Sequence, residues 1–303
     1  MYDLIILGGG PAGLTAAAYA LHKRLETLVI TQDLGGKTSL RFHAPWLEGH
    51  ELLSGVELVN RFKSQLEYLE FVHELDRAVQ VVRNDRTFSV RTEKQKQFEA
   101  RALIVATGTT AKRLAVPGER ELLGRGISYS AVSHAPLFID RQVALIGQGT
   151  RALYAAAELA LVAKGLVLIL PDPKDVEAPL AKKLAENPKV KVLSGFQISE
   201  IVERDRFITG IALRHNGTSR GFEIEGLFVE MGTTPNSQMV AGLVEFDAEN
   251  RIVVNARMAT NCPGLFAAGD VTNTVAEQVL VAIGDGAKAA LNVYEYLLGR
   301  ITV

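Results

Sequence analysis

DLIILGGGPAG spans residues 3–13 and joins an apolar strand to the motif Gly8-x-Gly10-x-x-Gly13. A helix and then a second strand at Thr27–Thr31 are expected to follow, which completes a strand–helix–strand unit. In such a unit the first glycine allows the tight turn, the second lets the backbone approach a pyrophosphate, and the third lets helix and strand pack closely. Free N–H groups at the helix start then hold the anion. The stretch predicts a dinucleotide site, against the alternative of a plain glycine turn in an α/β fold.

The bulk composition narrows the class of protein. A chain of 303 residues suggests two domains, and 48% hydrophobic and 22% charged residues are typical of a soluble globular protein. The formal net charge of −1 provides no general attraction to nucleic acid or acidic membranes. No apolar run is long enough to span a bilayer, and no targeting segment is expected. The single cysteine, Cys262, excludes an internal disulfide and a cysteine metal cluster, so we expect no metal and a cytoplasmic location.

A second glycine turn makes the chain a tandem. The strand Gln142–Ile146 runs into GQGTRA at 147–152, and a helix and another strand are expected to follow. Asp172 follows Gly147 at the interval at which Asp33 follows Gly8, which supports two copies of one architecture. The residues that could meet a nicotinamide dinucleotide here are Gly147, Gly149, Thr150, Arg151 and Asp172.

Three further motifs accompany the glycine turns. The turns Ala106–Gly108 and Gly232–Asn236 each follow a buried strand, and the stretch Gly264–Asp270 precedes a long helix expected at about Ala276–Leu298. Asp270 could accept a ribityl or ribose hydroxyl, or could simply cap the helix. A helix N-terminus carries roughly half a positive charge, which would stabilise an anion formed on a reduced flavin.

Together these motifs resemble the low-molecular-weight thioredoxin reductases over residues 2–299. The resemblance implies a homodimer and an α/β fold. By this resemblance the fold would have two Rossmann-like three-layer ββα domains of the FAD/NAD(P)-dependent disulfide oxidoreductase type, with the second domain inserted into the first. The FAD-binding domain would take 1–113 and 244–303, and the NAD(P)-binding-like domain would take 116–242.

The resemblance and the first glycine turn together place several separate stretches around FAD. The residues are Gly8, Gly10, Pro11, Ala12, Gly13, Asp33, Gly36, Lys37, Val79, Ala106, Thr107, Gly108, Gly269, Asp270, Glu277, Gln278 and Val279. Asp33 could accept a ribose hydroxyl or be a solvated turn residue. Glu277 stands where the family has an arginine, and an acid there is expected to oppose the reduced flavin anion. Trp46 could flank a bound ring or anchor the core.

The dithiol of the family is missing. Where the family has Cys-x-x-Cys followed by Asp, this sequence has Ser130, Ser133 and His134. A serine hydroxyl forms no disulfide and no comparable thiolate, so flavin-to-disulfide transfer within the chain is not expected. The serines are either native or engineered, and the accompanying change at His134 favours natural divergence. His134 could be an acid–base group, because an imidazole titrates in the useful range, or a structural histidine.

The stretch expected to contact the electron donor also differs from that of the family. The NADP-dependent members carry a His-Arg-Arg run after the second-domain strand, whereas this chain has Leu170-Pro171-Asp172-Pro173. Asp172 would repel a 2′-phosphate and could accept the free 2′-hydroxyl of NAD. NADPH is therefore not expected, while use of NADH and use of no nicotinamide both stay open.

The leading hypothesis is an FAD-dependent oxidoreductase that passes electrons from NADH or a protein electron carrier to an external acceptor. A quinone, oxygen, a ferredoxin, a flavodoxin or a thioredoxin-like protein could be that acceptor. The alternatives are a ferredoxin- or flavodoxin-NAD(P) reductase-like enzyme and a non-catalytic FAD-binding redox sensor.

Overall fold

The computed structural model describes residues 1–47, 55–68, 71–274 and 276–299 and divides into two compact units. Unit 1 comprises Met1–Arg41, Leu52–Thr110 and Thr234–Val303, and unit 2 comprises Phe42–Glu51 and Ala111–Thr233. The chain therefore crosses between the units four times. Near two of these crossings β7 (Thr109–Ala111) pairs with β16 (Thr233–Pro235).

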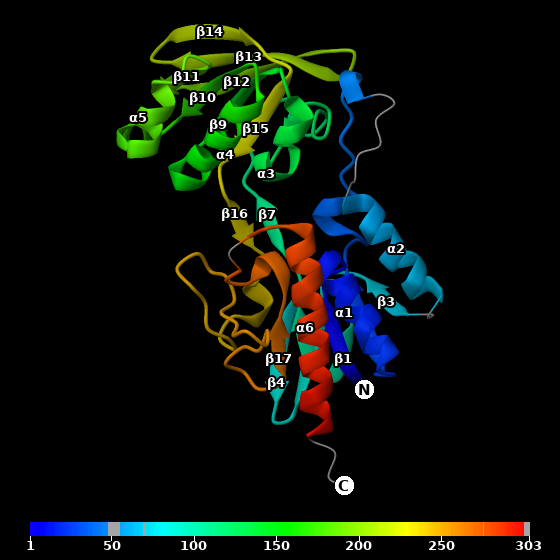
Figure 1. Ribbon diagram of the computed structural model, residues 1–303. Helices are drawn as coiled ribbons and strands as arrows, with labels where there is room; N and C mark the ends of the chain where they lie inside the picture. The colour runs from blue at the N-terminus through cyan, green and yellow to red at the C-terminus, as the bar shows by residue number, and fades with distance from the viewer. Residues whose placement is uncertain (48–54, 69–70, 275, 300–303) are drawn as a thin grey trace. The chain divides into compact units, whose positions relative to one another are not determined.

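Unit 1 is built on a sheet in which parallel strands run in the order β3-β2-β1-β6-β17. Strand β6 also continues an antiparallel hairpin of β4 and β5. The strands are β1 (Tyr2–Leu7), β2 (Thr27–Thr31), β3 (Val72–Leu75), β4 (Ala78–Asn84), β5 (Thr87–Thr92), β6 (Gln97–Val105) and β17 (Leu265–Ala267). This arrangement gives the three-layer ββα organisation that the sequence predicts (Figure 1).

The helices of unit 1 cover one face of the parallel sheet. They are α1 (Pro11–His22), α2 (Gly55–Tyr68) and α6 (Val279–Leu298), with short 3₁₀ turns η1 (Gly36–Ser39), η5 (Gln238–Val240) and η6 (Gly269–Val271). Successive residues of a strand point to opposite faces, so Leu4 and Ile6 pack towards the helices while Ile5 and Leu7 pack towards the hairpin layer. Figure 1 shows α1 and α6 side by side. Small residues allow this approach, because a Cβ on Gly286 would lie 2.1 Å from the Ala12 carbonyl oxygen.

Unit 2 repeats the plan with a parallel sheet in the order β11-β10-β9-β15-β8 and an antiparallel sheet of β12, β13 and β14. The parallel strands are β8 (Ile127–Ser128), β9 (Gln142–Gly147), β10 (Gly165–Leu170), β11 (Val190–Ser194) and β15 (Gly226–Glu230). The antiparallel strands are β12 (Gln197–Arg204), β13 (Phe207–His215) and β14 (Thr218–Glu223). The helical segments are η2 (Pro45–Leu47), α3 (Ala131–His134), η3 (Ala135–Phe138), α4 (Gly149–Val162), η4 (Pro173–Glu177) and α5 (Pro179–Ala185).

Two details differ from the expectation. The C-terminal helix starts at Val279 and not at Ala276, because residues 276–278 are not helical and Gln278 is the N-cap. The segment with Trp46 packs in unit 2, although its sequence position assigns it to the FAD domain. The indole N–H of Trp46 donates to the Leu137 carbonyl at 2.7 Å, and the ring packs edge-on against Phe138. Trp46 is therefore a core anchor of unit 2.

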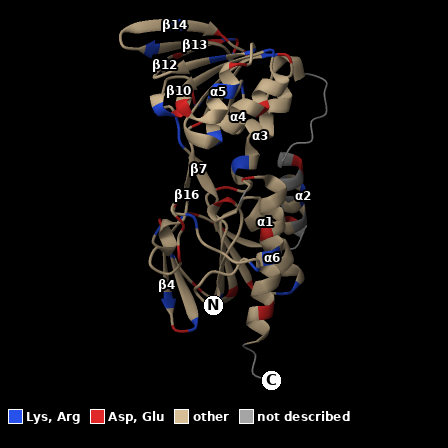
Figure 2. Ribbon diagram, turned by 60° about the vertical axis from the view of Figure 1, so that its left-hand side comes forward, with Lys and Arg blue, Asp and Glu red and all other residues tan. Residues whose placement is uncertain are grey.

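No helix in the described part of the chain is both long and apolar enough to cross a membrane. In the view of Figure 2, basic and acidic segments are interspersed along the described ribbon of each unit, which agrees with the formal net charge of −1.

Candidate functional site

The first glycine turn joins β1 to α1 and leaves no room for a side chain at Gly8, Gly9 or Gly13. Gly8 has φ +110°, and a Cβ there would lie 2.3 Å from the Ala106 carbonyl oxygen. A Cβ on Gly13 would lie 1.9 Å from the Gly8 carbonyl oxygen. These two glycines hold the start of α1 close to the end of β6, where the Ala106–Gly108 turn begins.

Gly10 is different, because nothing in the protein forbids a side chain there. Its φ of −76° suits any residue, and no atom lies within 4 Å of a Cβ built on it. Gly10 is the N-cap of α1 without a side-chain hydrogen bond, and Pro11 begins the helix, whose first turn carries no acid. The helix N-terminus thus faces open space with its partial positive charge. This cradle fits the pyrophosphate of a dinucleotide.

The turn after β2 folds back on this cradle. The Gly35 N–H donates to the Gly9 carbonyl at 2.7 Å, and a Cβ on Gly36 would lie 3.3 Å from the Gly10 Cα. Asp33 supports the turn, since its Oδ1 accepts the Gly36 N–H at 2.8 Å. A ribose contact by Asp33 stays a prediction.

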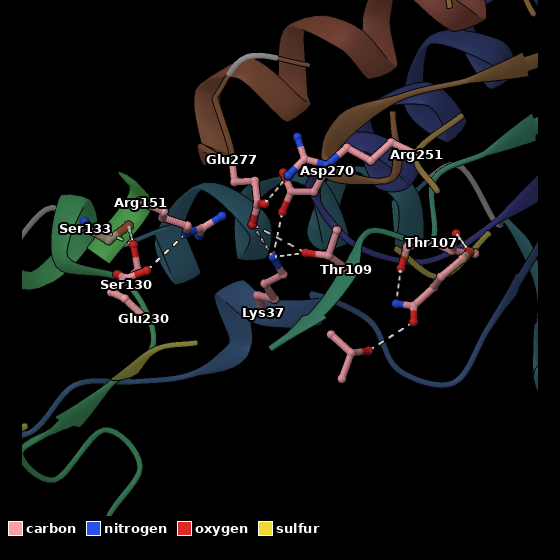
Figure 3. Close-up of polar contacts among 12 residues, drawn as sticks. Lys37, Thr107, Thr109, Ser130, Ser133, Arg151, Glu230, Arg251, Asp270 and Glu277 are labelled. Carbon is pink, nitrogen blue, oxygen red and sulfur yellow. Dashed lines mark hydrogen bonds and ion pairs between the residues drawn. The ribbon is translucent and has the colours of Figure 1, made fainter. Parts of the chain in front are cut away.

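Lys37 is the centre of a polar cluster in unit 1 (Figure 3). Its Nζ lies 2.6 Å from Thr109 Oγ1, 2.8 Å from Asp270 Oδ2 and 3.2 Å from Glu277 Oε2. The side chains of Asp270 and Glu277 are only 17% and 12% exposed, whereas that of Lys37 is 48% exposed, so water screens the pairs in part. Three segments far apart in sequence therefore meet at one ammonium group.

Glu277 carries a second cation partner. Nη2 of Arg251 lies 3.3 Å from Glu277 Oε1, while the other carboxylate oxygen faces Lys37. The sequence led us to expect an acid that opposes a reduced flavin anion. The Glu277 carboxylate is compensated by Lys37 and Arg251, and its effect on a reduced flavin stays a prediction. Sequence reasoning missed the contributions of Arg251 and Thr109, since neither belongs to a recognisable motif.

Asn236 joins two of the sequence motifs to each other. Its Nδ2 donates to the Thr107 carbonyl at 3.0 Å, its N–H donates to the Gly108 carbonyl at 3.0 Å, and its carbonyl accepts the Thr107 hydroxyl. Thr110 Oγ1 also donates to the Asn236 side-chain oxygen at 3.0 Å. The asparagine of the GTTPN turn therefore fixes the Ala106–Gly108 turn beside the first glycine turn.

The remaining residues predicted around FAD lie mostly at the same edge of the sheet. Gly108 has φ +62° and open space beside it, and a Cβ on Gly269 would lie 3.1 Å from the Cβ of Ala12. Gln278 and Val279 are the N-cap and first residue of α6, whose first turn carries no acid. Val79 instead lies exposed on β4, and its predicted role stays a prediction.

The second glycine turn joins β9 to α4, and a Cβ built on Gly149 meets no atom within 4 Å, as at Gly10. A Cβ on Gly147 would lie 2.5 Å from the Cβ of Ala152, so this glycine is required for packing. Gly149 has φ +66°, and its N–H donates to Asp175 Oδ2 at 2.9 Å. Thr150 follows in the first turn of α4 and is exposed.

Both charged residues predicted for a nicotinamide dinucleotide already have partners. Nε of Arg151 lies 3.1 Å from Oε2 of the buried Glu230, whose other oxygen accepts the Ala131 N–H at 2.9 Å (Figure 3). Asp172 caps η4, since its Oδ1 accepts the Lys174 N–H at 2.9 Å.

The two serines at the dithiol position of the family lie together. Ser130 is the N-cap of α3 and its Oγ accepts the Ser133 N–H, while the two Oγ atoms are 3.0 Å apart (Figure 3). The residue spacing of Cys-x-x-Cys is therefore kept with hydroxyls in place of thiols.

His134 follows the serines and is partly buried. Its Nδ1 lies 2.8 Å from Ser128 Oγ, and its ring packs 5.0 Å from that of Phe42. Burial lowers the pKa of His134 from 6.5 to about 4. This lowered pKa corrects the expectation that the imidazole titrates near neutral pH. In the folded chain the imidazole is uncharged at neutral pH. Its catalytic role stays a prediction.

The lowered pKa of His134 predicts a pH-dependent stability. His134 binds a proton near pH 6.5 in the unfolded chain but only near pH 4 in the folded chain. Its contribution to the free energy of unfolding is therefore complete above pH 6.5. It is lost as the pH falls from 6.5 to 4, by up to about 3 kcal/mol. Urea unfolding across this range tests the prediction. His134→Gln should reduce the dependence of the free energy of unfolding on pH, whereas His73→Gln, at an exposed position, should not. The same pH dependence in wild type and both variants would refute the prediction.

Two linked dinucleotide-type units, one with an open anion cradle, define the class of flavin-dependent oxidoreductases with two nucleotide folds. Residues 2–286 match the family model of pyridine nucleotide-disulphide oxidoreductases, and the chain belongs to this family. Family membership and the cradle in unit 1 both support FAD as the cofactor.

Similar proteins include curated relatives that are longer than this chain and solved structures of about its length. The chain is 32% identical to a component of the alkyl hydroperoxide reductase of Pseudomonas aeruginosa and 32% identical to an NADH dehydrogenase of Bacillus subtilis, in each case over 98% of its own length. It spans only 58% and 59% of those two proteins. The thioredoxin reductase structure of Streptococcus pyogenes matches with a TM-score of 0.90 at 31% identity, and each chain is covered to 99%. That of Giardia duodenalis matches with a TM-score of 0.88 at 27% identity, over 98% of this chain and 99% of the other.

Proposed function

We propose that this chain is an FAD-dependent oxidoreductase that passes electrons from an external donor through FAD to an external acceptor, without an internal dithiol. The observation that carries the proposal is the Ser130–Ser133 pair, with hydroxyl oxygens 3.0 Å apart where the resembling family has its dithiol. Hydroxyls neither accept two electrons nor form a disulfide. The two electrons received by FAD must therefore leave directly to the acceptor.

FAD, when bound, supplies both two-electron and one-electron redox chemistry. The protein would hold it through the Gly10 cradle, the Asp270 carboxylate and the N-terminus of α6. Lys37 and Arg251 compensate the carboxylates of this cluster, so the site takes up negative charge on reduction at a smaller electrostatic cost. A homodimer and a protein electron carrier as partner belong to the same proposal.

An anaerobic mixing experiment tests the proposal. The FAD-loaded protein is mixed with reduced methyl viologen, and the bleached flavin is then mixed with a quinone. We expect bleaching and full return of the flavin absorbance, with two electrons transferred in each direction. A flavin that no donor reduces, or that no external acceptor reoxidises, would instead favour a redox sensor without turnover.

A substitution of Lys37 is expected to change the flavin potential. Lys37→Met removes the cation between Asp270 and Glu277, so the added electrons meet uncompensated carboxylates and the midpoint potential falls. Spectroelectrochemistry of the bound flavin measures the change. The double variant Lys37→Met/Glu277→Gln should recover most of the shift. Lys288→Met removes an equal charge from the Asp285 pair on α6 and serves as the control. A Lys37→Met potential equal to that of the control would contradict the role of Lys37.

A further inference from the structure

The two glycine turns of this chain differ in what occupies their helix N-terminus. Neither the N-cap of α1, Gly10, nor that of α4, Gln148, makes a side-chain hydrogen bond, and open space lies beside both Gly10 and Gly149. At α4 the Gly149 N–H donates to the Asp175 carboxylate at 2.9 Å. An anion is therefore already present where the pyrophosphate of a dinucleotide would bind in unit 2.

The position of Asp175 follows from the sequence after β10. Pro173 starts η4, and Asp172 caps it by accepting the Lys174 N–H. This short 3₁₀ turn carries Asp175 to the start of α4, where its charge interacts favourably with the helix dipole. In the same unit, Arg151 pairs with the buried Glu230. The Gly149 amide and the two charged side chains predicted to bind a nicotinamide dinucleotide, Arg151 and Asp172, are thus engaged with groups of the chain itself.

We propose that Asp175 excludes nicotinamide dinucleotides from unit 2 by occupying the N-terminus of α4, so that neither NADH nor NADPH is the electron donor. A bound dinucleotide would have to displace the Asp175 carboxylate from the Gly149 N–H and place its pyrophosphate near that charge. The negative charges of the pyrophosphate and the carboxylate repel each other, which opposes binding. The displaced carboxylate also loses a charge-assisted hydrogen bond. The inference rests on the proposed function. It restricts the electron donor of that function to compounds or proteins that do not bind as a dinucleotide in unit 2.

Calorimetric titration of the FAD-loaded protein with NADH, without an electron acceptor, tests the inference. Wild type is expected to bind NADH with a dissociation constant above about 1 mM. Asp175→Ala should bind at least about tenfold more tightly, and Asp175→Asn, which keeps the hydrogen-bond acceptor without the charge, should lie between them. Glu177→Ala is the matched control, because it removes one acid from η4 at an exposed position paired with Lys182.

Two results would overturn the inference. One is wild-type binding of NADH in the micromolar range, and the other is an affinity of both Asp175 variants no greater than that of Glu177→Ala. If Asp175→Ala fails to fold, Asp175→Asn carries the test, since it retains the contact with Gly149. The readout is binding heat and does not depend on flavin reduction. The titration therefore tests only whether Asp175 excludes NADH. Whether the chain is an oxidoreductase is tested separately by the methyl viologen experiment.

Discussion

Gly10→Val is expected to yield a folded protein that no longer binds FAD. The backbone at Gly10, with φ −76° and ψ −175°, suits a β-branched residue before a proline, and no protein atom lies within 4 Å of the new Cβ. The valine would fill the space that the pyrophosphate needs at the start of α1. We expect the dissociation constant for FAD to rise by about 100-fold or more. Flavin absorbance of the purified protein and titration of the apoprotein with FAD measure this change.

The control for Gly10→Val is Gly221→Val on β14 of unit 2. A Cβ there also meets nothing within 4 Å, so the two variants add the same side chain into open space. Gly221→Val should retain FAD, and the far-ultraviolet circular dichroism of both apoproteins should equal that of wild type. A folded Gly10→Val that binds FAD with unchanged affinity would show that the first glycine turn is not the FAD site.

Ser130→Cys/Ser133→Cys is expected to restore a redox-active disulfide. The wild-type Oγ atoms lie 3.0 Å apart, and the longer C–S bonds bring two sulfur atoms within reach of a disulfide bond of about 2.05 Å. The double variant should then accept four electrons per FAD in an anaerobic reductive titration, two in the flavin and two in the disulfide. Thiol counting before and after the titration identifies the second pair of electrons.

The single variant Ser130→Cys is the control and should accept two electrons per FAD. The natural Cys262 does not interfere, since it is buried and unpaired. If the double variant forms its disulfide but still accepts only two electrons, this pair does not occupy the place of the family's dithiol.

Much of unit 1 could be predicted from the local sequence. The alternation in β1, with Leu4 and Ile6 towards the helices and Ile5 and Leu7 towards the hairpin layer, needs only an apolar strand between two covered faces. The glycine spacing predicted a tight turn at Gly8, and in the structure a Cβ on Gly8 would strike the Ala106 carbonyl. Such features are local, and short-range sterics determine them.

The charge pairing in both units could not be predicted in this way. Lys37 and Glu277 are 240 positions apart, so only the folded chain shows that one compensates the other. Asp175 was missed for another reason. The interval after the glycine turn directs attention to Asp172, whereas the 3₁₀ turn after Pro173 brings Asp175 to Gly149. The only sequence pattern that marks Asp175 is a proline two positions before an acid. Many loops share this pattern.

The proposed function requires that FAD be the only redox group through which this chain passes electrons. Anaerobic titration of the wild-type, FAD-loaded protein with dithionite tests this requirement, because the number of electrons accepted per FAD counts the redox groups. We predict full bleaching of the flavin after two electrons, with no further uptake. Uptake of four electrons per FAD would reveal a second two-electron group and would contradict the proposed function.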